Sequence, residues 1–209
     1  MRISVIISLL IISSVETISA QNSYIKLGQQ ALMDGDFKAA VAQLERACLI
    51  DSTNSTALLM LGYSYYHSEN YKKSIAAYTK EIAINPTDAT AYYYRARAKG
   101  YLGKDNQTSS ADKEKYLLGA IFDLTKAITI DPDVTRNKYY QVRGIAYREY
   151  GLFKLQATGK QFDKARAINS LRASVADLEK VLADNPGRSD ISTLIDLSKQ
   201  KLNEALAHK

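Results

Sequence analysis

Residues 55–88 read STALLMLGYSYYHSENYKKSIAAYTKEIAINPTD, and the pattern within this stretch recurs along the chain. A shift of 34 residues places Leu61 and Gly62 over Leu27 and Gly28 of the preceding stretch. Self-similarity at one fixed period is the signature of an array of stacked structural units. The sequence therefore predicts a repeat protein, and its other features are best judged against that repeat.

The pattern predicts four repeat units, at residues 21–54, 55–88, 89–134 and 137–188. The third unit carries a 12-residue insertion and the fourth an 18-residue insertion. If the longer insertion divides between two antiparallel helices, the fourth unit should project beyond its neighbours. All three prolines fall in one column of this alignment, and each follows Asn or Asp: Pro86, Pro132 and Pro186.

Each unit is expected to be a pair of helices, since the chain has only 10 Gly and 3 Pro and lacks the turn signals of many short strands. Val41, Leu44, Ala47 and Cys48 recur at steps of three and four, which makes one apolar helical stripe. Small residues in the two helices should allow close backbone approach: Gly28, Gly62, Ala96 and Gly144 in the first, and Ala40, Ser74, Ala120 and Ser174 in the second.

These columns resemble the tetratricopeptide repeat, a 34-residue helix-turn-helix with Leu-Gly in its first helix and a closing proline. The resemblance implies an all-α, right-handed solenoid of antiparallel helix hairpins. One hairpin cannot bury both its faces, so residues 189–209 are expected to form a C-terminal capping helix. Arg95 and Arg143 depart from the family by replacing Leu, and Glu81 replaces a small residue.

In this family the first helices of the units line a concave groove that accepts an extended peptide or a helix. Column by column, the resemblance predicts a set of partner-binding residues, which we call the groove face: Ile25, Gln29, Met33, Tyr63, Tyr66, His67, Tyr93, Arg97, Tyr101, Gln141, Ile145 and Arg148. Tyr and Arg dominate protein-binding hot spots. The Lys and Asn clamp by which some family members grip a chaperone's C-terminal carboxylate is absent from the matching columns, which disfavours that partner class.

Catalysis requires a constellation of reactive groups, and the sequence offers none. There are two histidines and one cysteine, with no phosphate-binding glycine loop, zinc motif or nucleophile elbow. We predict no enzyme activity, no cofactor and no metal; the alternative is an enzyme that uses the array as a frame. Asp123, Asp177 and Glu179 fall at polar helical positions, where we expect solvated charges.

The first twenty residues have the layout of a secretory signal peptide, with Arg2 before the apolar run Ile3 to Ile12 and a small residue, Ala20, at the end. The run is shorter than the roughly 20 apolar residues of a membrane-spanning helix. We predict cleavage after Ala20, no membrane span thereafter, and a periplasmic or secreted protein. The alternative is a segment retained as an N-terminal anchor.

The function predicted from these features is that of a protein- or peptide-binding scaffold or adaptor. The net charge of +6 comes from 28 Lys and Arg scattered among 22 acidic residues, so a nucleic-acid partner is not expected. The alternative is a homo-oligomerising structural module that uses the extended fourth hairpin.

Overall fold

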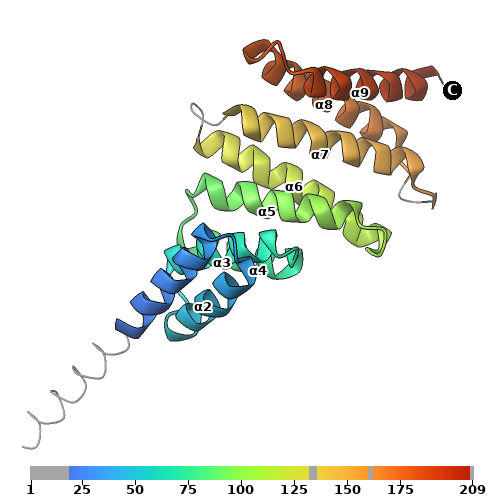
Figure 1. Cartoon of the computed structure of the whole chain (residues 1–209). Coiled ribbons are helices and arrows are strands. Elements are labelled where there is room, and N and C mark those ends of the chain that lie inside the picture. The colour runs from blue at the N-terminus through green and yellow to red at the C-terminus, as the bar shows by residue number, and fades with distance from the viewer. Residues whose placement is uncertain (1–18, 132–135, 160–161, 208–209) are drawn as a thin grey trace, which may run out of the picture. The chain divides into compact units, whose positions relative to one another are not determined.

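The computed structural model describes residues 19–131, 136–159 and 162–207 (Figure 1). Within these residues all regular structure is helical, which confirms the all-α prediction. Helical residues 19–33 are followed by α2 (Phe37–Ile50), α3 (Ser55–His67), α4 (Tyr71–Ile84), α5 (Ala89–Lys104), α6 (Ser110–Ile130), α7 (Arg136–Gln156), α8 (Lys164–Asp184) and α9 (Ser189–Ala207). Residues 1–18 of the predicted signal segment and Pro132 lie outside the described residues, so these two predictions stay untested.

Helix starts are fixed by capping side chains that accept hydrogen bonds from backbone N–H groups in the first turn. Asn54 Oδ1 accepts from the N–H of Ala57 at 2.9 Å and begins α3. Ser109 Oγ accepts from the N–H of Asp112 at 3.2 Å and begins α6. Further caps stand before the other helices: Asp36, Asn70, Asp88 and Asp163.

The chain divides into two compact parts, an N-terminal part up to Pro86 and a C-terminal part from Thr87. In the N-terminal part α2 packs on α3 and α3 on α4. A methyl group at Gly62 would lie 2.8 Å from the Tyr78 ring, so only glycine fits there without displacing the ring. The small residue at position 62 therefore allows the two helices of this hairpin to approach closely, as the sequence predicts.

In the C-terminal part each helix packs on the next from α5 to α9, and α9 also contacts α7. Figure 1 shows these helices as successive layers of one stack. Ile191 and Ile195 of α9 are buried against Leu178 and Val181 of α8. Helix α9 therefore covers the last apolar face of the stack, as a capping helix should.

The insertions lengthen helices in both the third and the fourth unit. Helices α6, α7 and α8 have 21 residues each, against 13 in α3 and 14 in α4. The fourth hairpin does not project alone, because Lys154 of α7 forms a 2.7 Å ion pair with Glu114 in the added part of α6. Tyr150 also donates a hydrogen bond to Glu114, at 3.2 Å. The fourth hairpin therefore does not project free of its neighbours as expected, since α6 is extended alongside it, although α5 has only 16 residues.

Two buried ion pairs join the helices of the third and fourth hairpins. Arg95 binds Asp123 through Nε and Nη2 at 2.8 and 2.7 Å, and Lys99 Nζ reaches the same carboxylate at 2.8 Å. Arg143 binds Asp177 in the same way, at 2.7 and 2.9 Å.

The expectation that Asp123 and Asp177 are solvated was therefore wrong. Asp123 is fully buried and Asp177 only 4% exposed. Each carboxylate pairs with an Arg that replaces a repeat Leu, because a carboxylate shielded from water requires a cation nearby. Glu179 is exposed, as expected.

Candidate functional site

Three groove-face residues lie on the first helix, within residues 19–33. Ile25 is half-buried, whereas Gln29 and Met33 are exposed, Met33 by 74%. Their exposure leaves them accessible to solvent within the N-terminal part. No hydrogen bond or ring contact to them is described that would give this segment a defined binding geometry.

The three groove-face residues of α3 belong to an aromatic cluster. The His67 ring stacks on Phe37 with centroids 4.7 Å apart and lies 4.2 Å from the Tyr63 ring. Tyr66 meets His67 and Tyr71 edge to face at 5.1 and 5.8 Å. Tyr66 is only 5% exposed, so it contributes mainly to packing, whereas His67 is exposed and Tyr63 half-buried.

A cavity of about 320 Å³, which we call the α5–α7 cavity, lies in the C-terminal part between α5 and α7, with residues of α6 at its base. Five of the six groove-face residues from these two helices line it: Tyr93, Arg97, Tyr101, Gln141 and Ile145. The sixth, Arg148, does not, and its Nη1 forms a 3.0 Å ion pair with Glu149. The structure thus brings together residues from two different repeats that lie far apart in the sequence.

The wall of the α5–α7 cavity combines aromatic rings with cations. The Arg97 guanidinium lies 5.5 Å from the centroid of the Tyr93 ring, and Lys138 Nζ lies 5.2 Å from the same centroid. Lys104 Nζ lies 5.4 Å from the Tyr101 centroid. Such contacts hold the long cationic side chains against ring faces, where each is worth about 0.5–1 kcal/mol at exposed sites.

Lining residues that the sequence analysis did not select include Lys104 on α5 and Lys138 on α7. Helical spacing could have found them, since Lys104 follows Tyr101 by three positions and Lys138 precedes Gln141 by three. Both were missed because neither residue stands at a position that the groove-face columns select.

Gly100 also lines the cavity, and a Cβ at this glycine would meet no atom within 4 Å. Its role is unlike that of Gly62, because no neighbouring helix requires the missing side chain. A residue with a side chain at position 100 would occupy open space at the cavity wall. This glycine keeps the wall between Tyr93 and Lys104 clear.

Neither a metal site nor a membrane-spanning helix is found in the ranges that the structure describes. No group of three or more His, Cys, Asp or Glu side chains there is arranged to hold a metal ion. None of the described helices combines the length and the apolar character needed to cross a bilayer. The α5–α7 cavity, with its one carboxylate paired to Arg148, offers recognition groups rather than an acid and base facing each other.

Comparison by sequence identifies the repeat. Residues 55–88 match the sequence model of a family described as tetratricopeptide repeat. These bounds coincide with those given to the second unit from the internal pattern; the bounds of the other units stay predictions. No curated protein matches the chain.

Comparison by structure extends the likeness to most of the chain. The crystal structure of MamA superposes with a TM-score of 0.63 at 20% identity, over 90% of this chain and 86% of that one. A thermophilic tetratricopeptide-repeat protein of Thermus thermophilus, TTC0263, gives 0.53 at 18% identity, over 86% of this chain and 99% of that one. An O-GlcNAc transferase of Thermobaculum terrenum gives 0.52 at 17% identity, over 78% of this chain and 26% of the enzyme.

These structures share less than 25% sequence identity with this chain, so the likeness establishes its fold and not the identity of a ligand. The predicted resemblance is confirmed, since one repeat matches by sequence and most of the chain matches by fold. The transferase shows that such an array also occurs within an enzyme, of which the matched region is about a quarter.

Proposed function

Because this chain carries the tetratricopeptide repeat and its fold, we propose that it is a non-enzymatic scaffold that binds a segment of a partner protein in the α5–α7 cavity. The groove-face residues Tyr93, Arg97, Tyr101, Gln141 and Ile145 make the contact. Binding needs no cofactor and no metal. The partner is a protein or peptide, met in the periplasm or outside the cell after export through the N-terminal signal segment.

The observation that carries this proposal is the convergence of five groove-face residues, from two repeats, on one cavity. Its volume of about 320 Å³ lies at the small end of the range typical of ligand pockets, so it suits one or two side chains rather than a whole domain. Tyrosine and arginine offer large contact areas with polar ends, which favours recognition of a peptide carrying an aromatic or acidic group.

A blocked-cavity variant tests the binding site. Peptides of 12 residues are selected from a random displayed library on the purified protein, and the dissociation constant of the best binder is measured by fluorescence anisotropy. We expect Gly100→Trp, which places an indole in the open space of the wall, to weaken binding at least tenfold. Gly100→Ala is the matched control and should leave binding within about twofold, since a methyl group meets no atom there.

A second variant, Tyr93→Ala with Arg97→Ala, removes wall groups instead of filling the cavity, and should also weaken binding. Circular dichroism establishes that each variant keeps its helices. If folded Gly100→Trp and the double variant both bind the selected peptide as the parent does, the cavity is not the site. These binding experiments do not test an enzymatic role, which requires a separate turnover assay.

Self-association is the alternative, and one observation favours it. Phe162, in the turn between the helices of the fourth hairpin, is 51% exposed. An exposed aromatic side chain at a hairpin tip can pair with a second copy of the chain. Light scattering across a hundredfold concentration range decides this point: a dimer that Phe162→Ser converts to a monomer supports self-association, and a monomer throughout excludes it.

A further inference from the structure

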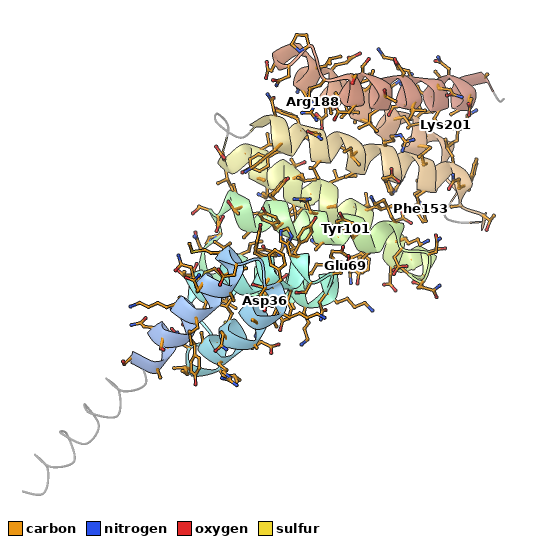
Figure 2. The ribbon with its side chains drawn as sticks, viewed as in Figure 1. Asp36, Glu69, Tyr101, Phe153, Arg188 and Lys201 are labelled. Carbon is orange, nitrogen blue, oxygen red and sulfur yellow. The ribbon has the colours of Figure 1, made fainter. Side chains whose placement is uncertain are left out.

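We infer that the insertions in the third and fourth repeats build a second binding subsite, which takes a carboxylate-bearing part of the same bound peptide segment. This inference rests on the proposed function and names the chemistry of the ligand. The subsite is a second cavity of about 270 Å³ in the C-terminal part, here called the insertion cavity. Figure 2 labels Tyr101 on α5 and Phe153 on α7, which line the first and the second cavity respectively.

The insertion cavity exists only because the helices are longer than those of a standard hairpin. A first helix of 13 residues, like α3, would end at Tyr101 in α5 and at Arg148 in α7. A second helix of 14 residues, like α4, would begin at Leu117 in α6. Apart from Leu117, the lining residues all lie beyond these points, among them Lys104, Lys113 and Phe153.

The added helical turns are held in place by specific contacts, so the walls of the insertion cavity are built rather than incidental. The Glu114–Lys154 ion pair measures 2.7 Å, and Lys154 is only 4% exposed. A methyl group at Gly103 would lie 2.8 Å from the Leu117 side chain, so α5 and α6 approach closely here. These contacts fix α5, α6 and α7 around the cavity.

The two cavities are neighbours and share part of their lining. Lys104, Leu117 and Glu149 line both of them. Along α5, Tyr93 and Lys104 are separated by about 16 Å at about 1.5 Å per residue. An extended chain covers that distance with about five residues at about 3.3 Å each. One short extended segment can therefore reach from the first cavity into the second.

Charge selects the occupant of the second cavity. Lys104 and Lys113 line it, together with a single carboxylate, Glu149. That carboxylate accepts from Arg148 Nη1 at 3.0 Å, so its charge is balanced by a neighbouring cation. The remaining cationic character favours a carboxylate on the ligand, and Leu152 and Phe153 provide an apolar wall beside it. The ligand is thus an acidic peptide segment whose Asp or Glu follows or precedes the side chain held in the first cavity.

The test uses the peptides selected on the whole protein. We expect them to be enriched in Asp or Glu, and we expect Lys113→Glu to weaken binding roughly tenfold, since reversing one charge replaces attraction by repulsion. Lys115→Glu, two residues away on the same helix and lining neither cavity, is the matched control and should change binding less than twofold. Phe153→Ala tests the apolar wall without altering charge. Thermal denaturation verifies that each variant is folded.

The peptide supplies the other half of the experiment. Replacing its Glu or Asp by Gln or Asn should weaken binding to the parent, but not to Lys113→Glu, because the two charges act on each other. Selected peptides that lack acidic residues would overturn the inference. The inference would also be overturned if Gly100→Trp weakened binding of the peptides while Lys113→Glu and Phe153→Ala bound them as the parent does. In that case the proposed function stands. Peptides insensitive to Gly100→Trp would overturn the proposed function and the inference with it.

Discussion

The second hairpin joins its two helices by an apolar contact, whereas the third and fourth hairpins use ion pairs at the same positions of the repeat. In the N-terminal part, Leu61 of α3 and Ala77 of α4 lie in one apolar cluster. In the C-terminal part, the same two repeat columns hold Arg95 with Asp123, and Arg143 with Asp177.

The two helices of the hairpin pack on each other in both cases, so a bidentate ion pair can stand where another repeat has an apolar contact. The two solutions differ in what happens when one partner is lost. An apolar contact weakens in proportion to the surface removed, whereas half of a buried ion pair leaves an unbalanced charge without water.

The largest effect is expected from Asp123→Ala. This change leaves Arg95 and Lys99, whose side chains are only 12% and 17% exposed, without their shared carboxylate, and we expect the free energy of unfolding to fall by about 3–5 kcal/mol. Urea denaturation followed by circular dichroism measures it. Glu179→Ala, which breaks the exposed pair with Lys199, is the control and should cost less than about 1 kcal/mol. Equal losses in the two variants would mean that the buried pair contributes no more than a surface pair.

Converting the fourth hairpin to the chemistry of the second is the next test. The double variant Arg143→Leu with Asp177→Ala restores the residues of the N-terminal part, and we expect stability between unchanged and about 4 kcal/mol higher, because no charge is left buried. Asp177→Ala alone should be destabilising by the same mechanism, though less than Asp123→Ala, since it leaves one cation rather than two without a partner. A double variant as unstable as the single one would show that the two solutions are not interchangeable in this position.

A smaller effect is expected at two glycines, one in each part, whose surroundings differ. Gly62→Ala should lower the free energy of unfolding by about 1–3 kcal/mol, since its methyl group would lie 2.8 Å from the Tyr78 ring. Gly100→Ala, on the open cavity wall, should instead raise it by up to about 1 kcal/mol through helix propensity. Differential scanning calorimetry of the two variants measures both signs. The two changes in free energy of unfolding must have opposite signs, because only at Gly62 does a side chain of the facing helix leave no room for a methyl group.

The smallest effect concerns a polar contact of the N-terminal part that is only partly exposed. Tyr65 donates a hydrogen bond to Glu45, which lowers the pKa of the Glu45 carboxyl below its usual 4.5, with a further contribution from Lys73. A lowered pKa stabilises the fold above about pH 4.5, and that stabilisation is lost as the pH falls. Tyr65→Phe should cost less than about 1 kcal/mol at pH 7 because the carboxylate is partly exposed.

Melting temperatures between pH 7 and pH 3 test the origin of that effect. They should fall less steeply for Tyr65→Phe than for the parent chain. Identical slopes would exclude the Tyr65–Glu45 bond as a source of acid sensitivity.

The helices could be predicted because their signals are local: apolar steps of three and four, capping residues such as Ser109, and small residues such as Gly62 where helices meet. The buried acids were missed because a carboxylate at a polar helical position gives no local sign of burial. A non-local sign was present, since Arg95 and Arg143 occupy a column that is apolar elsewhere, and a buried cation needs an anion on the facing helix.

The α5–α7 cavity was largely predictable and the insertion cavity was not. Tyr93, Arg97 and Tyr101 lie at repeat columns, so their place on one face of α5 follows from the period. The inserted residues have no column, and whether they form a loose loop, a free hairpin or an extension of the stack depends on contacts such as Glu114 with Lys154. That pair joins residues 40 positions apart, and sequence spacing alone does not disclose it.

Helix α9 has a consequence for handling the protein. A brief detachment of this single helix would uncover Leu178 and Val181, which are otherwise hidden from water. Two molecules opened in this way expose the same apolar surface to each other, and aggregation can then proceed while every other helix stays folded. Turbidity during storage would register a weakened α9 earlier than any melting curve.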